Sequence, residues 1–265
     1  MTIAGSDPSG GAGLQADLKT FAALGVYGLS VLTAVIAQNS AQVVRVEPVT
    51  PEMVAAQLET IVAERVPDAL KIGALGSAAV ANVVVKKLTS LRLPAPVLDP
   101  VLVASSGTRL LEPVAEDVLR TQLIPQAALV TPNIPEAQVL SGIEIDGSAA
   151  LHQAAQTLHQ LGARAVLIKG GHWSTELGTI GQPVKVIDLF FDGRRFIDFA
   201  AARIPGSGAH GTGCALSAAI AAWLSQGTDL PTAITRAKRF ITAALEKPLM
   251  LGNGRCVLDH LGIER

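Results

Sequence analysis

The run Pro205-Gly-Ser-Gly-Ala-His-Gly-Thr-Gly-Cys214 leads directly into an apolar segment, Ala215 to Leu224. Glycines let the backbone curl tightly, and the apolar segment predicts a buried helix that begins at the end of the run. The first N–H groups of that helix and the positive end of its dipole point back into the curl. This combination favours an anion such as phosphate, with Cys214 in the first helical turn facing it. Taken alone, the run is equally compatible with an ordinary glycine-rich loop beside a small buried cysteine.

On either side of this run, apolar strand-like segments alternate with helical patterns. The expected strands span residues 1–4, 27–37, 69–72, 97–98, 127–130 and 165–168, followed by a hairpin of 184–191 and 194–199. The expected helices span residues 14–25, 51–62, 77–88, 112–123, 135–140, 148–161, 211–224 and 230–245. Repeated strand–helix units predict an α/β fold, with a mostly parallel central sheet and helices on both faces. We expect residues 1–265 to form a single domain.

The composition favours small molecules as partners over nucleic acid or a membrane. The formal net charge is −1 and only 16% of the residues are charged, so the chain has no basic footprint for nucleic acid. No apolar run reaches the about 18 residues that span a bilayer, and no targeting segment is recognised near Met1. Cys214 and Cys256 are too few for a disulfide framework, which favours a reduced, cytoplasmic protein.

Polar or glycyl residues follow nearly every predicted strand. In a parallel α/β sheet, ligands bind beyond the carboxyl ends of the strands, so these residues are candidates for a site. They are residues 5–7, 38–39, 73–74, 99–100, 131–136 and 169–171. Asp99 and Glu136 have the carboxylates that a magnesium–nucleotide complex needs, and Lys169 has the charge to meet a terminal phosphate. Each alone is better explained as a helix cap or a solvated side chain, but together with the 205–214 run they predict phosphoryl transfer from a nucleotide.

Several of these segments resemble those of one known family. They are Gly5-Ser-Asp-Pro-Ser-Gly-Gly-Ala-Gly-Leu-Gln-Ala-Asp-Leu-Lys-Thr-Phe21, Ala37-Gln-Asn39, Lys71-Ile-Gly73, Leu98-Asp-Pro-Val101, Thr131-Pro-Asn-Ile-Pro-Glu-Ala137, Lys169-Gly-Gly171 and His210-Gly-Thr-Gly-Cys214. They look like the hydroxymethylpyrimidine and hydroxymethylpyrimidine phosphate kinases of thiamine biosynthesis, which have a ribokinase-like fold. The resemblance covers about residues 2–247. It implies an enzyme that uses ATP to phosphorylate 4-amino-5-hydroxymethyl-2-methylpyrimidine, and then its monophosphate to the pyrophosphate.

The resemblance also implies roles for individual residues on the substrate side. Gln38 is expected to hydrogen-bond the aminopyrimidine edge, because an amide offers both a donor and an acceptor to a ring that presents both. Gly5, Ala12 and Asp17 are expected to shape or line the same pocket.

On the nucleotide side, the resemblance places Asn133 and Glu136 in the magnesium and phosphate motif, with Asp99 nearby and Lys169 at the phosphates of ATP. The transferred group is expected to lie in an anion hole formed by backbone amides. These amides belong to Gly211, Thr212 and Gly213.

Cys214 stands where most sugar kinases of this fold have an aspartate base. A thiol at a helix N-terminus can have a lowered pKa, which would make Cys214 a candidate base. The nucleophile of the second phosphorylation is a phosphate that is already ionised and needs little base. We therefore expect Cys214 to matter more for the first phosphorylation than for the second.

Position 74 departs from the family pattern, because relatives often have Met where this chain has Ala74. A roomier pocket keeps pyridoxal kinase as the close alternative, since pyridoxal is a similar flat heteroaromatic alcohol. A dinucleotide-dependent oxidoreductase fits poorly, because the glycines at 10, 11 and 13 do not have the Gly-x-Gly-x-x-Gly spacing. A non-catalytic vitamer-binding protein has no need of Asp99, Glu136 and Lys169.

The assembly and the moving parts are expected by analogy and by composition. Kinases of this fold are commonly dimers, so a homodimer is expected. The segments 5–13 and 174–183 lack apolar anchors and are the candidates for a loop that closes over the site and excludes water.

Overall fold

The computed structural model describes residues 1–104, 106–170, 185–204, 209–251 and 255–262. Its main sheet has eight strands in the order β10-β9-β8-β7-β6-β5-β1-β2. The neighbouring strands β8, β7, β6, β5, β1 and β2 pair in parallel, whereas β9 is antiparallel to both β8 and β10. The bounds are β1 Thr2–Ala4, β2 Ser30–Leu32, β5 Lys71–Ile72, β6 Val97–Leu98, β7 Leu129–Val130, β8 Val166–Ile168, β9 Lys185–Phe191 and β10 Phe196–Ala202. The expected mostly parallel sheet and the terminal hairpin are confirmed.

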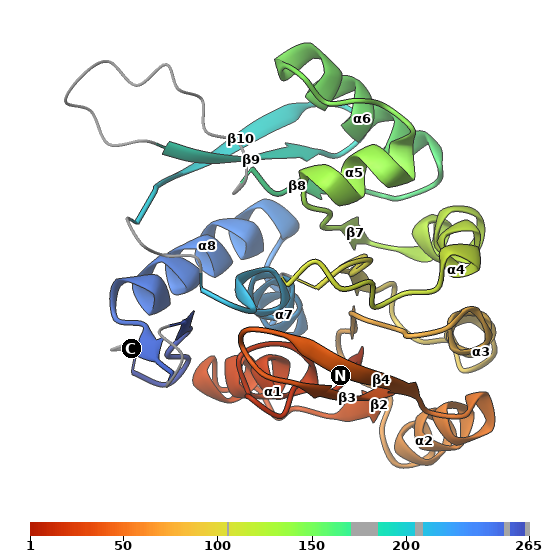
Figure 1. The fold of residues 1–265 in the computed structure, drawn as a ribbon. Coiled ribbons are helices and arrows are strands. Elements are labelled where there is room, and N and C mark those ends of the chain that lie inside the picture. The colour runs from red at the N-terminus through yellow and green to blue at the C-terminus, as the bar shows by residue number, and fades with distance from the viewer. Residues whose placement is uncertain (105, 171–184, 205–208, 252–254, 263–265) are drawn as a thin grey trace.

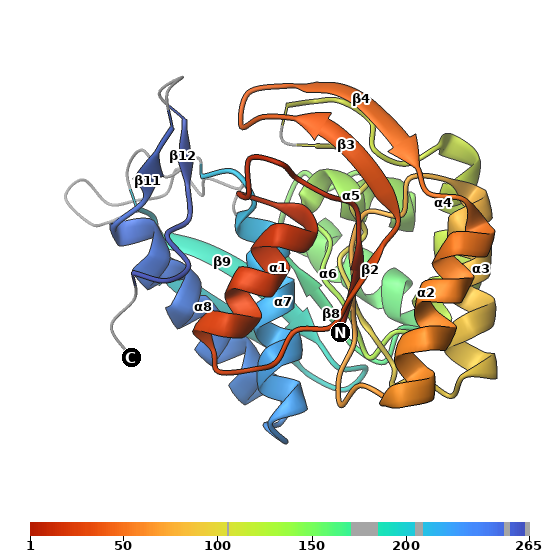
Figure 2. The same ribbon diagram turned by 90° about the horizontal axis from the view of Figure 1, so that it is seen from below.

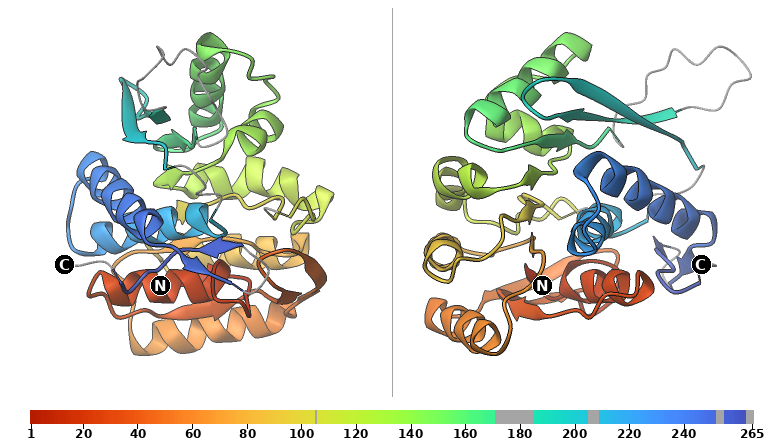
Figure 3. Two further views of the ribbon diagram at one scale, coloured as in Figure 1. Left: turned by 60° about the vertical axis from the view of Figure 1, so that its left-hand side comes forward. Right: turned by 180° about the vertical axis from the view of Figure 1, so that it is seen from behind.

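Helices cover both faces of this sheet (Figures 1 and 3). One layer contains α1 (Gly13–Ala23), α7 (Thr212–Ser225) and α8 (Leu230–Glu246). The other contains α2 (Pro51–Glu64), α3 (Ala78–Ser90), α4 (Pro113–Val118), α5 (Ile134–Ser141) and α6 (Ser148–Gln160). Side chains alternate across the sheet, so Val97 packs in the core under α7 while its neighbour Leu98 packs in the core on the opposite face. The two-sided burial explains why the central strands are apolar throughout.

Local sequence sets where several helices begin. The side chain of Thr50 accepts a hydrogen bond from the Met53 amide at the start of α2, and Ser77 does the same for Val80 at the start of α3. The predicted helix 112–123 is α4 followed by a π-helical turn and a 3-10 turn, which end at Gln126. Among the described residues, no helix is long and apolar enough to cross a membrane.

The prediction of one buried strand over residues 27–37 was wrong. The chain leaves the main sheet after β2, and residues Ala34–Gln38 form β3, which pairs with β4 (Val43–Pro48) in a separate antiparallel sheet. Thr33 makes the turn, because its hydroxyl donates to the Ala74 carbonyl oxygen at 2.6 Å. Val35 and Ala37 are apolar but face solvent, so this half-buried strand looks like a buried one in the sequence.

Two small sheets therefore lie at the same end of the molecule. Figure 2 shows β3 and β4 projecting there, beside a hairpin of β11 (Leu249–Met250) and β12 (Cys256–Val257). The hairpin β11–β12 had not been predicted, because strands of only two residues each are too short to show a periodic pattern. Both sheets flank the amino ends of α1 and α7, where the glycine-rich segments of the chain lie (Figure 2).

Candidate active site

A pocket of about 140 Å³ lies where the parallel strands end, and most of the predicted site residues line it. Those that do are Gly5, Ala12, Gln38, Ala74, Asp99, Asn133, Glu136, Lys169, Gly211, Gly213 and Cys214. Asp17 and Thr212 are absent from the lining. Residues 171–184 and 205–208, which include part of the glycine-rich run and one of the two expected mobile segments, lie outside the described residues. The pocket therefore lies beyond the carboxyl ends of the parallel strands, where a ligand site was predicted.

The turn at residues 209–213 delivers the amino end of α7 to this pocket. Gly211 has a φ of 86°, and a Cβ there would lie 1.7 Å from the Gly11 carbonyl oxygen, so no side chain fits. A Cβ on Gly213 would lie 3.1 Å from Lys169 Nζ, which puts the ammonium directly beside the turn. The Thr212 hydroxyl donates to the Ala209 carbonyl oxygen at 2.8 Å and so fixes the turn itself. The amino end of α7 and the Lys169 ammonium therefore lie side by side at the pocket, an arrangement that favours an anion.

Asp99 lies at the end of β6 and is held by three polar contacts. Lys169 Nζ donates to its carboxylate at 2.7 Å, the Thr131 hydroxyl at 3.3 Å and the Ser217 hydroxyl at 3.4 Å. Burial works to raise the pKa of Asp99, but the charges of Lys169 and Lys71 outweigh burial and hold the pKa below its usual value. Asp99 is thus an ionised carboxylate at neutral pH.

Glu136 is positioned by the start of α5. Its carboxylate accepts from the Asn133 amide at 2.8 Å, and the Asn133 side chain accepts from the Glu136 amide at 2.8 Å, which together form a capping box. Burial, together with the charge of Asp99, raises the pKa of Glu136 to about 7, against the opposing effect of Lys169. The capping role explains the Asn-x-x-Glu spacing locally, and the same spacing leaves the carboxylate in the pocket.

The described residues contain no cluster of three or more His, Cys, Asp or Glu side chains able to hold a metal ion. Asp99 and Glu136 are the two carboxylates in the pocket lining. That set fits Mg²⁺ carried in by a nucleotide, because Mg²⁺ keeps several waters and takes one or two carboxylates plus substrate phosphates.

The other side of the pocket is formed by the first loop and β3. Gly5 donates its amide to the Ala74 carbonyl oxygen at 3.1 Å, and a Cβ on Gly5 would lie 3.0 Å from Ile36 Cδ1. Gln38 is the last residue of β3, next to a bulge in the β3–β4 pairing, and its half-buried side chain lines the pocket. Ala74 also lines the pocket, where its side chain is a single methyl group.

Asp17, which was expected to shape or line the pocket, is completely buried outside the lining and pairs there with Lys71. Lys71 Nζ donates to the Asp17 carboxylate at 2.8 and 3.1 Å, and the Thr2 hydroxyl donates to it at 2.6 Å. Burial alone lowers the pKa of a lysine, but the charge of Asp17 outweighs it and raises the pKa of Lys71. Asp17 therefore acts through Lys71, which lines the pocket and which the sequence analysis had assigned no role.

The suggestion of a lowered pKa for Cys214 is contradicted. Burial raises the pKa of this thiol to about 11, and the favourable effect of Lys71 does not compensate. The charges of Asp99 and Asp17 also raise it. Cys214 lines the pocket as a neutral thiol at physiological pH.

A link between two loops of the site had also not been predicted. The completely buried Asp7 carboxylate accepts from His210 Nε2 at 3.0 Å, from the Ala12 amide at 2.7 Å and from the Ser9 amide and hydroxyl. Burial works to raise the pKa of Asp7, but these hydrogen bonds outweigh it and hold the pKa below its usual value. His210 also donates its own amide to the Cys256 carbonyl oxygen at 3.0 Å. Asp7 and His210 therefore tie the loop of residues 5–13 to the turn at residues 209–213 and to β12.

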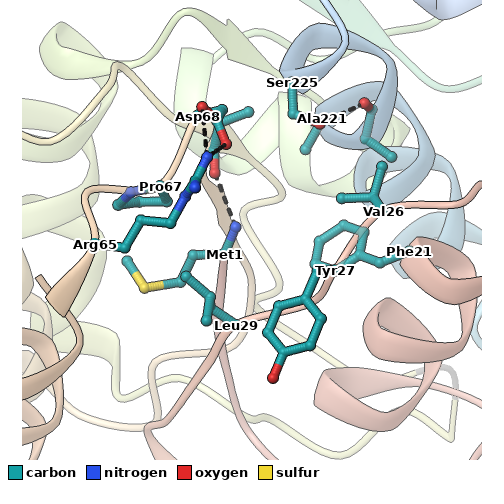
Figure 4. A pocket seen from close by; sticks show the side chains of 12 residues that line it. Met1, Phe21, Val26, Tyr27, Leu29, Arg65, Pro67, Asp68, Ala221 and Ser225 are labelled. Carbon is teal, nitrogen blue, oxygen red and sulfur yellow. Dashed lines mark hydrogen bonds and ion pairs between the residues drawn. The ribbon is translucent and has the colours of Figure 1, made fainter.

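A second pocket, of about 310 Å³, contains none of the predicted site residues (Figure 4). It lies at the amino ends of the strands, where the Met1 amine donates to the Ala69 carbonyl oxygen at 2.9 Å. Arg65 in its wall is already paired with Asp68 at 3.1 Å. This pocket offers no group with the chemistry that the sequence predicted.

Comparison with known proteins gives one family. A family model described as phosphomethylpyrimidine kinase matches residues 7–259. A hydroxymethylpyrimidine/phosphomethylpyrimidine kinase of Rhizobium meliloti is 43% identical over 98% of this chain and 96% of its own length. The thiamine biosynthesis bifunctional protein ThiED of Geobacter sulfurreducens is 46% identical, and the chain spans 52% of its length.

Among solved structures, a pyridoxal kinase from Staphylococcus aureus in complex with AMP-PCP and pyridoxal superposes with a TM-score of 0.86. It is 33% identical, and the match covers 100% of this chain and 94% of that one. The likeness confirms the expected ribokinase-like fold.

Proposed function

The chain belongs to the phosphomethylpyrimidine kinase family, and from this premise we propose that it phosphorylates 4-amino-5-hydroxymethyl-2-methylpyrimidine and then its monophosphate in thiamine biosynthesis. It is a phosphotransferase that uses ATP. One observation carries the assignment of the site. The amide-bearing Gln38 and the charged residues Asp99, Glu136 and Lys169 line a single pocket.

The charged side binds and orients the phosphates. Lys169 Nζ lies between the Asp99 carboxylate and the amino end of α7, so it can neutralise a transferred phosphoryl group there. The amides of residues 211–213 add fixed donors without reorganisation, because Gly211 is held against the Gly11 carbonyl. Phosphoryl transfer has a loose transition state, so positioning and charge neutralisation supply most of the catalysis.

Magnesium is part of the proposal, and Asp99 and Glu136 are the residues that would hold it. When bound, the ion would neutralise charge on the nucleotide phosphates. The capping box keeps the Glu136 carboxylate directed into the pocket whether or not a metal is present.

The substrate side orients the nucleophile. Gln38 is proposed to bind the aminopyrimidine edge, with Gly5, Ala12 and Ala74 shaping the space around the ring. Cys214 is proposed to contact the reacting hydroxyl as a neutral thiol. With a pKa of about 11, only about one thiol in ten thousand is ionised at pH 7, so Cys214 positions the hydroxyl more than it removes the proton.

Pyridoxal is the second candidate substrate. The structural relative from Staphylococcus aureus was solved with pyridoxal, and the small side chain of Ala74 leaves space in the pocket for a ring with different substituents. We propose that any pyridoxal phosphorylation is secondary, because the Rhizobium meliloti relative, which matches over its full length at 43% identity, is a hydroxymethylpyrimidine/phosphomethylpyrimidine kinase.

Two variants test the assignment of the two sides. In Lys169→Met, calorimetric binding of the aminopyrimidine alcohol should stay within about threefold of the wild type while turnover falls by at least about 100-fold. In Gln38→Ala, that binding should weaken by about 5- to 150-fold, the effect of 1–3 kcal/mol for an unpaired polar group. The proposal fails if Lys169→Met keeps full turnover or if Gln38→Ala binds the alcohol as tightly as the wild type.

Three further expectations belong to the proposal. Residues 1–265 are proposed to act as a single kinase domain, since the main sheet joins strands from Thr2–Ala4 to Phe196–Ala202 and the later helix α7 packs against β5, β6 and α1. A homodimer and a cytoplasmic location are also proposed. Sedimentation of the purified protein and fractionation of the producing cell test these two.

A further inference from the structure

A large cavity lies outside the proposed active site. It measures about 650 Å³ and is bordered by the end of α1, by α7, by α8 and by the C-terminal segment. It shares no lining residue with the active-site pocket. Pockets that bind small molecules typically have volumes of 300–1,000 Å³, so this cavity has the size of a ligand site.

The walls of the cavity are largely apolar and partly aromatic. Phe240 of α8 is 8% exposed and contributes its ring, while Leu24 and Ala243 supply aliphatic surface. Trp223 at the end of α7 adds a second ring. Such walls suit a flat apolar body, because aromatic pairs gain from stacked or edge-to-face contact in addition to area burial.

The charge on the rim is positive. The Arg236 guanidinium lies 4.8 Å from the centre of the Trp223 ring, and Arg239 follows one turn later on α8. None of the lining residues is acidic, and within the described part of the chain neither arginine has a carboxylate within 4.0 Å. Other charges lie nearby: those of Lys19 and Asp259 influence the pKa of His260, and that of Arg236 lowers the pKa of Asp229. Two unpaired guanidiniums above an apolar cavity favour an anionic ligand.

Two polar atoms in the lining lack a partner within the described residues. They are Trp223 Nε1 and His260 Nε2. His260 is only 3% exposed, and burial lowers its pKa to about 4, so its ring is neutral. Buried polar groups in proteins are nearly always hydrogen-bonded, so two orphaned nitrogens in neighbouring walls are unusual. Both nitrogens are themselves fully buried, so the argument for a ligand rests on the size of the cavity, its aromatic walls and its two arginines.

We propose that the cavity bordered by Trp223, Arg236, Arg239 and His260 binds a small planar apolar anion, such as an aromatic carboxylate, sulfonate or phosphate ester. The ring of the ligand lies against Phe240, and its anionic group meets the two arginines. The site is separate from catalysis, but α1 and α7 both begin at the active-site pocket and end at this cavity. A ligand here therefore contacts the far ends of the two helices whose amino ends shape the active site.

The probe for a test is 8-anilino-1-naphthalenesulfonate, an aromatic sulfonate whose emission rises in an apolar site. In a Trp173→Phe background, Trp223 is the one remaining tryptophan of the two in the sequence, so it reports proximity by energy transfer to the probe. Titration should show a single saturable site with quenching of Trp223, and saturating magnesium–ATP should not displace the probe.

Two variants and a matched control locate the site. The double substitution Arg236→Gln/Arg239→Gln should weaken binding at least about tenfold, because it removes both charged donors. Ala243→Phe should abolish saturable binding by filling the cavity, and Arg194→Gln, which changes an exposed arginine in the β9–β10 turn, should bind like the wild type. Melting temperatures identify any variant that fails to fold. Equal affinity in all four proteins, weakening by Arg194→Gln as large as that by the double substitution, or displacement by ATP would each overturn the proposal.

Discussion

The contact between Asp7 and His210 provides a sharp test of how the site is assembled. His210→Ala removes the donor at 3.0 Å but leaves Asp7 its contacts with Ser9 and Ala12, so the first loop keeps its own turn. What is lost is one hydrogen bond to a buried carboxylate, worth about 1.5–3 kcal/mol. If that energy holds the loop of residues 5–13 against the turn at residues 209–213 in the transition state, kcat/KM falls by about 10- to 150-fold.

The assay is steady-state ADP release with magnesium–ATP and the aminopyrimidine alcohol, alongside thermal melting. We expect most of the loss in kcat, because both loops must be in register only when the phosphoryl group is transferred. His210→Gln restores a donor and should recover part of the rate. Asp192→Ala removes comparable loop hydrogen bonds, at 2.9 and 3.0 Å, in the β9–β10 turn and should leave the kinetics unchanged. A lowered melting temperature with kcat/KM within twofold of the wild type would refute the reasoning and make the contact purely structural.

Four further predictions follow from the site. Burial raises the pKa of Glu136 to about 7, so protons compete with the metal for its carboxylate. The apparent magnesium affinity should therefore fall about tenfold for each pH unit below 7 and level off above it. Glu136→Gln preserves the capping geometry and should remove this slope in a magnesium titration. Cys214→Ala should slow the phosphorylation of the alcohol by at least about tenfold more than that of the monophosphate, and equal loss in both steps, measured by ADP release, would exclude the proposed role. Gly211→Ala should cost at least about 100-fold in kcat/KM because its methyl group would meet the Gly11 carbonyl at 1.7 Å; wild-type kinetics would contradict the tight turn. Ala74→Met should reduce any turnover of pyridoxal relative to that of the pyrimidine alcohol, and an unchanged ratio of the two kcat/KM values would remove position 74 from substrate selection.

Much of the fold could be predicted because local signals agree with the final structure. Apolar runs buried on both faces mark β6 and β7, and the caps at Thr50 and Ser77 begin helices where they were expected. The strand β3 was misplaced because an apolar residue such as Val35 gives the same signal whether it faces the core or solvent. Exposure depends on what the rest of the chain packs against a strand, and local sequence does not contain that information.

The sequence predicted which strand-end residues belong to the candidate site, but it did not predict the contacts between distant residues. Strand-end position and the family resemblance were enough to single out Asp99 and Glu136. The pair Asp7 and His210 lies 203 residues apart in sequence, and Lys71 and Asp17 lie 54 apart, so neither pair leaves a local pattern. The raised pKa of Cys214 comes mainly from its burial, which the sequence near the helix N-terminus does not indicate.

The most direct test of the central claim is ADP release with magnesium and ATP, measured side by side for the aminopyrimidine alcohol, its monophosphate and pyridoxal. The account predicts turnover of both pyrimidine compounds with kcat/KM values above that for pyridoxal. Turnover of pyridoxal alone would contradict it and would assign the pocket bounded by Gln38 and Ala74 to a different vitamer.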